Sequence, residues 1–250
     1  MKRLSNSSKA VLATLICHVA WGFSFMASRT GLNYVPVFQL LSHRYLIAFL
    51  IMSVLILTGR FKVDFKGKPV LKVLFLAFME PVIYIIGEQY GILHSTTIFS
   101  GVMTAMVPIA ATLAAWPFLK EKPTRGQLLF SILSVSGVIG IGLLSKDSGT
   151  LDWVGLVALL VAVASAAGYS MFSRFISGSF TPFERTYVMM CLGAAVFTPL
   201  SFLQMESPVL YLAPFKEPVY LITMLYLGPL ASVICYFLSG YALTDRKSVV

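Results

Sequence analysis

Long apolar stretches, separated by short polar or basic segments, recur along the whole chain. A helix that crosses the roughly 30 Å hydrocarbon core of a bilayer needs about 20 predominantly apolar residues. Six uncharged stretches have about that length or more: Ala10–Ser28, Gln89–Leu119, Gly126–Ser145, Trp153–Ser173, Thr186–Met205 and Pro218–Thr244. Two further stretches, Val37–Gly59 and Val70–Leu93, are similarly apolar but carry charges within them. The pattern predicts an all-α integral membrane protein.

The Gln89–Leu119 stretch is too long for a single spanning helix. Residues 94–97 in its middle are polar and are typical of a short loop. Residues 89–93 before this loop then belong to the Val70–Leu93 helix, and the next helix begins after it. The prediction is therefore eight transmembrane helices. The first of them could instead be a cleaved signal peptide, but its best cleavage site places the bulky Phe25 where a small residue is needed, so a permanent helix is favoured.

The composition excludes several classes of protein. Hydrophobic residues make up 58% of the chain and charged residues only 12%, about half the share of roughly 25% in soluble domains. An ordinary soluble enzyme, a disordered chain and a disulfide scaffold are therefore excluded. The three cysteines lie in apolar stretches without a CxxC pair, and no HExxH, GxSxG or paired-aspartate motif is present. We therefore expect no enzymatic activity, no cofactor and no metal.

The net charge of +9 does not indicate a nucleic-acid partner, because the basic residues are distributed between the apolar stretches. With the N-terminus inside, 14 basic residues lie in cytoplasmic segments: Lys2, Arg3, Lys9, Arg60, Lys62, Lys66, Lys68, Lys72, Lys120, Lys122, Arg125, Arg174, Arg246 and Lys247. Only Arg29, Lys146 and Lys216 lie in outer loops. By the positive-inside rule, both termini are predicted to be cytoplasmic, in a multi-pass protein of the cell membrane.

Short matches between the two halves of the chain indicate an internal duplication. The segment 22–29 resembles 168–174, and both Gly22 to Gly168 and Pro36 to Pro182 are 146 positions apart. The spacing predicts a first repeat over residues 1–147, with five helices, and a second over 148–250, with three. An odd number of helices inverts the second repeat in the membrane, which is the architecture of many secondary transporters. The second repeat is predicted to be incomplete.

Three segments resemble the EamA family of the drug/metabolite transporter superfamily: 20–25 in the first helix, 107–122 with its proline and terminal glutamate, and 126–138. The resemblance implies a ten-helix carrier with two five-helix repeats that exports amino acids, other metabolites or drugs. The expected partners are a small-molecule substrate and the lipid bilayer. Because two helices of the second repeat are missing, the alternative to a carrier is a truncated, non-transporting membrane protein that acts as a partner or scaffold. The same gap suggests a homo-oligomer in which a second chain covers it.

Ionisable residues within a membrane span are costly and are functional candidates by default. At 100° per residue, one face of the third helix carries Glu80, Tyr84, Gly87, Glu88 and Gly91. Glu80 lies near mid-span and is a candidate for proton coupling, while Pro81 is expected to bend the helix. For both glutamates the alternative is a neutral carboxyl that only bonds a neighbouring helix. Gly87 and Gly91 form a small-xxx-small pair that favours close helix packing.

Three further residues are candidates for substrate binding or coupling. Arg44 in the second helix is expected either to pair with a glutamate of the third helix or to bind a substrate carboxylate. His18 and Trp21 share a face of the first helix; each is a candidate ligand or relay, with ordinary packing as the alternative. Ser232 and Tyr236 lie on a comparable but less specific polar face of the eighth helix.

Overall fold

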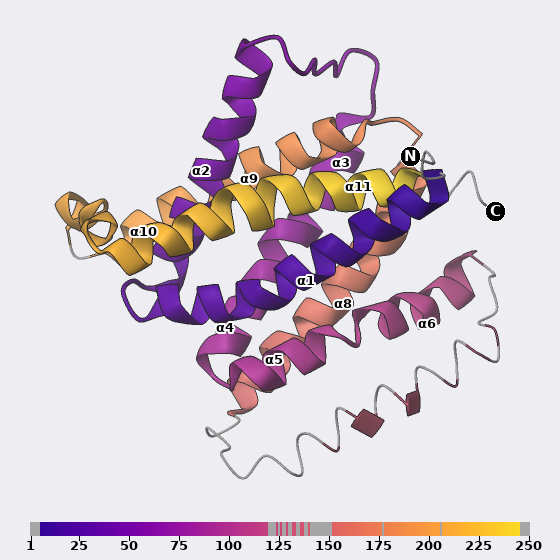
Figure 1. The fold of residues 1–250 in the computed structure, drawn as a ribbon, viewed down its shortest axis with the longest axis horizontal. Helices are drawn as coiled ribbons and strands as arrows, with labels where there is room; N and C mark the ends of the chain where they lie inside the picture. The colour runs from indigo at the N-terminus through magenta and orange to yellow at the C-terminus, as the bar shows by residue number, and fades with distance from the viewer. Residues whose placement is uncertain are drawn as a thin grey trace, which may run out of the picture. The chain divides into compact units, whose positions relative to one another are not determined.

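The computed structural model describes residues 6–119, 152–176, 178–205 and 207–245, and isolated positions between 124 and 140. This part of the chain is helical and contains no strand (Figure 1). The helices are α1 (Asn6–Leu32), α2 (Val37–Leu57), α3 (Val70–Ala77), α4 (Tyr84–Leu93), α5 (Thr97–Thr104), α6 (Val107–Leu119), α8 (Trp153–Ile176), α9 (Pro182–Gln204), α10 (Pro218–Leu225) and α11 (Cys235–Asp245). Two π-helical segments, η1 (Phe78–Ile83) and η4 (Tyr226–Ile234), join α3 to α4 and α10 to α11. Two short 3-10 turns are η2 (Pro208–Leu210) and η3 (Ala213–Lys216).

The predicted all-α class is confirmed for the described residues, in which six segments are long and apolar enough to cross a membrane. They are Val37–Leu57, Val70–Leu93, Thr97–Ala114, Trp153–Ser173, Pro182–Gln204 and Pro218–Gly240. Each coincides with a predicted helix. The first predicted span, Ala10–Ser28, falls inside the 27-residue α1. The predicted helix Gly126–Ser145 lies outside the continuously described residues.

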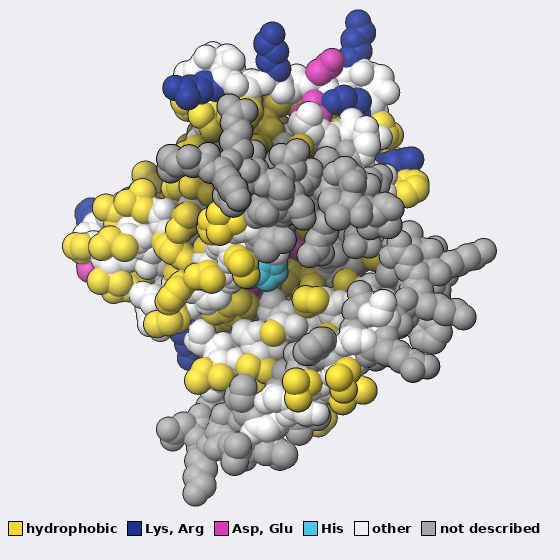
Figure 2. Space-filling model, turned by 45° about the vertical axis from the view of Figure 1, so that its right-hand side comes forward, with side chains coloured by type: hydrophobic (Ala, Val, Ile, Leu, Met, Phe, Trp, Pro, Cys, Tyr) yellow, Lys and Arg dark blue, Asp and Glu magenta, His cyan; other side chains and the backbone are white. Residues whose placement is uncertain are grey.

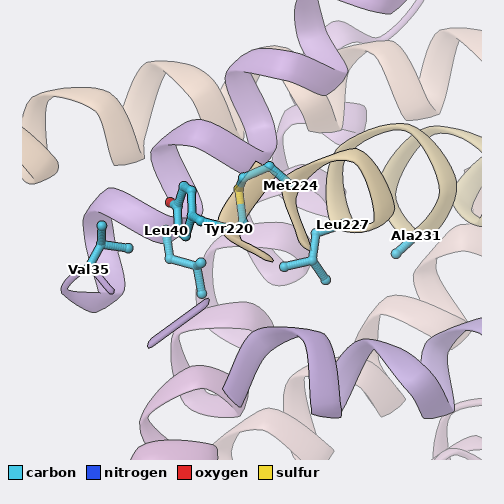
Figure 3. Packing of buried hydrophobic residues seen from close by; sticks show 6 residues of the cluster. All are labelled: Val35, Leu40, Tyr220, Met224, Leu227 and Ala231. Atoms are coloured by element: carbon cyan, nitrogen blue, oxygen red, sulfur yellow. The ribbon is translucent and has the colours of Figure 1, made fainter. Parts of the chain in front are cut away.

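The chain divides into two compact units, which we describe separately. Unit 1 comprises residues 1–82 and 173–250, and unit 2 comprises residues 83–172. In unit 1, α2 packs along α9, while α1 packs along α10, η4 and α11. An apolar cluster (Figure 3) fills the space between the start of α2 and the α10–η4 helix, with Leu40, Tyr220 and Leu227 fully buried in it.

In unit 2, α4 packs closely against α8 through its two glycines. A Cβ added to Gly87 would lie 2.5 Å from the carbonyl oxygen of Ala158, and one added to Gly91 would lie 2.4 Å from Leu159 Cδ2. At Gly87 the neighbour is backbone, so a side chain there would force the two helices apart, whereas at Gly91 it would meet only a side chain; close packing of this kind is what the small-xxx-small spacing predicts. At the adjoining helix ends, His94 Nδ1 lies 3.3 Å from Asp152 Oδ2.

The surface carries many large apolar side chains. Leu15, Val19, Phe23 and Met26 of α1 are all about half exposed or more. In Figure 2, apolar side chains are spread over much of the visible face, and most of the visible Lys and Arg side chains lie toward the top of the view. A soluble protein seldom exposes so much contiguous apolar surface, whereas a lipid-facing surface requires it.

Candidate functional site

Two helical stretches are interrupted by proline at positions that lie in unit 1, and polar side chains gather beside these two positions. Pro81 lies within η1 and Pro229 within η4. A proline has no N–H to give to the helix and clashes with the preceding turn. In η1 the break falls at Glu80, whose φ of −141° and ψ of 112° are not helical. The predicted bend is confirmed, but the regular helical face expected to link Glu80 with Tyr84 and Glu88 is broken there.

Glu80 is held by a residue of the other interrupted helix. The hydroxyl of Tyr236 in α11 donates a 2.6 Å hydrogen bond to Glu80 Oε1. Both side chains are buried, with Glu80 7% and Tyr236 3% exposed. A short hydrogen bond to a carboxyl group lowers the cost of burying it.

Arg44 of α2 lies at the same place and is 2% exposed. Its Nε donates a 2.7 Å hydrogen bond to Ser232 Oγ, and Ser232 in turn donates to the carbonyl oxygen of Leu227. Arg44 and Glu80 both act electrostatically on the Tyr236 hydroxyl. We call Glu80, Arg44, Ser232 and Tyr236 the polar cluster. It brings together two oppositely charged groups from α2 and η1 with two hydroxyls from η4 and α11.

The first helix provides one wall of the polar cluster. Trp21 Nε1 donates a 3.0 Å hydrogen bond to the carbonyl oxygen of Ala231 in η4, an acceptor that a regular α-helix would use internally. The Trp21 ring also packs edge-on against Tyr236, with 5.5 Å between ring centroids. His18 is exposed; its Nδ1 donates to the Thr14 carbonyl of its own helix. Trp21 therefore contacts the polar cluster, whereas His18 contacts it only through the Trp21 ring.

The other two predicted site residues lie together in unit 2. The hydroxyl of Tyr84 donates a 3.1 Å hydrogen bond to Glu88 Oε1, and Gln89 Nε2 donates to Glu88 Oε2 at 3.3 Å. The six predicted residues thus form two groups: Glu80, Arg44, Trp21 and His18 in unit 1, and Tyr84 and Glu88 in unit 2.

A further buried polar group near the start of α2 was not predicted from the sequence. His43 Nδ1 and the Tyr220 hydroxyl share a 2.7 Å hydrogen bond, and His43 Nε2 is buried without a partner. The neighbouring Ser42 is bonded to the hydroxyl of Tyr211. The i, i+3, i+4 spacing of Gln39, Ser42 and His43 in an apolar helix was the available signal.

The described residues offer little to bind a metal. Among them, no three His, Cys, Asp or Glu side chains are grouped so that they could hold an ion. The polar cluster contains one carboxyl group and one guanidinium, both of which can form hydrogen bonds with polar organic groups.

Comparison with known proteins points to a transporter. An uncharacterized transporter of Bacillus subtilis (YcxC) is 31% identical over 243 residues, which are 96% of this chain and 78% of that protein. An uncharacterized transporter of Archaeoglobus fulgidus is 23% identical over 72% of this chain and 62% of its own length. A second B. subtilis transporter, YwfM, is 29% identical over 68% of this chain and 53% of its own length. The chain thus spans less than two thirds of the latter two relatives. The model of the EamA-like transporter family matches residues 8–143, and the chain belongs to this family.

Proposed function

We propose that this protein is a secondary transporter of small metabolites and that the polar cluster of unit 1 is its substrate or coupling site. The observation that carries the proposal is the 2.6 Å hydrogen bond between Tyr236 and Glu80, which is buried between two proline-interrupted helices. Interrupted helices near the middle of a membrane are where transporters of inverted-repeat architecture bind substrates and coupling ions.

In this proposal, Glu80 takes up and releases the coupling proton. A carboxyl group in a buried site exchanges a proton with modest changes in its surroundings. When the carboxyl is ionised, the Tyr236 hydroxyl and the Arg44 guanidinium stabilise it. When it is protonated, Arg44 is available to a negatively charged or carbonyl group of the substrate. Export of amino acids, other metabolites or drugs is the class of transport we propose.

The packing supports an inverted pair of repeats. Pro81 and Pro229 are 148 positions apart, close to the 146 that separate Pro36 from Pro182, and both lie in π-helical segments. In unit 1, the predicted first helix of one repeat packs along α10–α11 of the other. In unit 2, α8, the first helix of the second repeat, packs on α4 of the first. We propose the repeats 1–147 and 148–250, eight transmembrane helices, and both termini in the cytoplasm.

We propose supporting roles for the other candidates. Trp21 forms a wall of the site, because it contacts Tyr236 and the backbone of η4. Tyr84 and Glu88 form a second polar pair, which we assign to substrate passage or coupling within unit 2. His18 is exposed and packs edge-on against Trp21, so we assign it to fixing the orientation of that ring.

Efflux measurements test the proposal. Cells that express the protein would be loaded with a panel of labelled amino acids and other metabolites, and their efflux compared with cells expressing Glu80→Gln. The matched control is Glu217→Gln, because Glu217 is an exposed acid in the α9–α10 connection and is not part of the polar cluster. We expect Glu80→Gln to abolish the dependence of efflux on the proton gradient and Glu217→Gln to preserve it. Equal efflux by wild type, Glu80→Gln and an empty vector across the panel would contradict the proposal.

A further inference from the structure

The connection between the second and third helices occurs once in each repeat, and each connection is bonded to the start of the other repeat's second helix. Residues 58–69 join α2 to α3, and residues 205–217 join α9 to α10. The first connection contacts the start of α9, whereas the second contacts the start of α2. All of these residues belong to unit 1. The two contacts are related by nearly the same offset as the repeats, because Glu184 lies 142 positions after Ser42 and Tyr211 lies 143 positions after Lys68.

Tyr211 is at the centre of the contact between α2 and the α9–α10 connection. Its hydroxyl is bonded to Ser42, and its carbonyl oxygen accepts a 3.1 Å hydrogen bond from Gln39 Nε2. Its ring packs edge-on against His43 and stacks on Phe202, with centroid distances of 4.4 and 4.9 Å. Burial raises the pKa of Tyr211 above its ordinary value, so the hydroxyl keeps its proton through the physiological range. This contact is therefore uncharged.

Glu184 is at the centre of the corresponding contact between α9 and the α2–α3 connection. Both of its carboxylate oxygens accept hydrogen bonds from Lys68 Nζ at 2.7 Å. Glu184 Oε1 also accepts a hydrogen bond from the backbone N–H of Asp64. The second oxygen accepts from the N–H of Thr181, which completes a capping box at the start of α9. This contact is ionic, and the Glu184 side chain is only 3% exposed.

Aromatic side chains add to the Glu184 contact and fix the orientation of the α2–α3 connection on α9. Phe61 of the connection stacks on Phe183 of α9, with ring centroids 4.2 Å apart and planes within 1° of parallel. Lys68 also lies 5.6 Å from the centroid of the Phe180 ring. Aromatic packing therefore holds the α2–α3 connection on α9 in addition to the Lys68–Glu184 ion pair.

We infer that Tyr211 and Glu184 are two latch residues that hold opposite ends of the transporter shut in turn. The inference rests on the proposed transport function and deepens it. The polar cluster lies on α2, η1, η4 and α11. In this inference it becomes accessible from one end when α2 separates from the α9–α10 connection, and from the other end when α9 separates from the α2–α3 connection. Tyr211 bonds the α9–α10 connection to α2, and Glu184 bonds α9 to the α2–α3 connection, so each residue must lose its contact for the corresponding end to open. In the proposed orientation, the Tyr211 latch is external and the Glu184 latch cytoplasmic.

The two latches differ in chemistry, and this difference makes them separable by experiment. Lys68→Gln removes the ion pair while leaving the capping box of Glu184 and its bond to Asp64. Tyr211→Phe removes the hydroxyl while leaving the ring contacts. Lys72→Gln is the matched control for the first, because Lys72 lies over the Phe175 ring and not on Glu184. Tyr34→Phe is the control for the second, because Tyr34 is partly exposed and contacts Tyr220 by its ring.

The test measures access to the polar cluster from each side. Ser232→Cys is introduced after the three native cysteines are replaced by serine, and its rate of reaction with a membrane-impermeant thiol reagent is measured in right-side-out and inside-out vesicles. Losing one hydrogen-bonded contact shifts an opening equilibrium about two- to ten-fold. We expect Lys68→Gln to raise labelling from the cytoplasmic side and lower it from the outside, and Tyr211→Phe to do the reverse. The two controls should match the parent.

A cross-linked variant gives a second measurement that does not depend on a destabilised latch. In Lys68→Cys/Glu184→Cys, a short bifunctional methanethiosulfonate reagent, which can reach across the space left by the two long side chains, should cross-link the two thiols and stop labelling of Ser232→Cys from the cytoplasmic side, and reduction of the cross-link should restore it. Shifts in the same direction for both latch variants, shifts no larger than those of the controls, or unchanged labelling after cross-linking would overturn the inference. Opposite shifts without transport of any tested metabolite would support the latches and count against the proposed function.

Discussion

The hydroxyl of Tyr236 and Oε1 of Glu80 are joined by a 2.6 Å hydrogen bond that links two helices, each interrupted by a proline. The residues are 156 positions apart in the sequence and come from the two predicted repeats. Because both side chains are buried, the bond couples the conformations of the two interrupted segments. In the proposed mechanism, a change in the protonation of Glu80 would be transmitted directly to α11 through this bond.

Removing the hydroxyl should destabilise the protein measurably. Tyr236→Phe removes a 2.6 Å hydrogen bond from a buried carboxyl oxygen, which typically costs about 1–3 kcal/mol. We expect the unfolding temperature in detergent to fall, and to fall less in a Glu80→Gln background, because part of the loss is then already incurred. Tyr34→Phe serves as the control. A Tyr236→Phe variant as stable as wild type would show that the hydrogen bond contributes nothing.

Alanine at the two glycines of α4 should cost stability to different extents. At Gly87, a Cβ would meet the backbone oxygen of Ala158 at 2.5 Å, whereas at Gly91 it would meet the end of the Leu159 side chain, which can move. We expect Gly87→Ala to lower stability by about 1–3 kcal/mol and Gly91→Ala by less. Gly101→Ala is the matched control, since nothing lies within 4 Å of its Cβ position. Thermal unfolding monitored by size-exclusion chromatography would rank the stabilities of the three variants. A larger loss for Gly91→Ala than for Gly87→Ala would argue against this packing of α4 on α8.

Cys17 and Cys235 should be joined by mild oxidation. Cys17 Sγ donates to the carbonyl oxygen of Cys235 at 3.3 Å, and both residues are buried in one cluster between α1 and α11. We expect a membrane-permeant copper–phenanthroline oxidant to remove two protons and two electrons from the thiols and form a disulfide, detected as a linked peptide pair by mass spectrometry. Cys191, which is exposed, should be absent from this pair. Two unreacted thiols after treatment of the folded protein would contradict the packing of α1 on α11.

Thiol labelling should also establish the orientation in the membrane. Lys62 and Val209 are exposed residues of the two connections, and Val209 is 88% exposed. In intact cells, we expect a cysteine at Val209 to react with an impermeant maleimide and one at Lys62 to react only after permeabilisation. The opposite result would place the basic connection outside and overturn the predicted topology.

Much of the helical architecture could be predicted from the sequence, because span length and proline positions are local signals. Pro36 and Pro182 stand at the start of α2 and α9, and Pro81 marks the interruption beside Glu80. The break at residues 105–106 between α5 and α6 was not predicted, although Pro108, the second residue of α6, marks it in the same way.

Most of the site's contacts could not be predicted from the sequence, although its charged residues could. Glu80 and Arg44 were recognisable because a charge in an apolar stretch is conspicuous. Their partners Tyr236 and Ser232 were assigned low specificity, because hydroxyl residues are common in spanning helices. Tyr211 could not be found at all, because its role depends on a loop returning to α2 from the other half of the chain, and periodicity carries no information on such pairing.

The order in which the chain is synthesised has a consequence for how unit 1 is completed. Unit 1 is built from residues 1–82 and 173–250, so α1, α2 and η1 leave the ribosome well before the helices they pack against. At about 5–20 residues per second, roughly 8 to 30 s separate the synthesis of Glu80 from that of Tyr236. During that interval Arg44 and Glu80 enter the membrane before either hydroxyl of the polar cluster exists. Until the second segment is made, the side chains of Arg44 and Glu80 therefore lack the hydroxyl partners that they have in the folded protein, so their burial in unit 1 can be completed only after synthesis has reached α11.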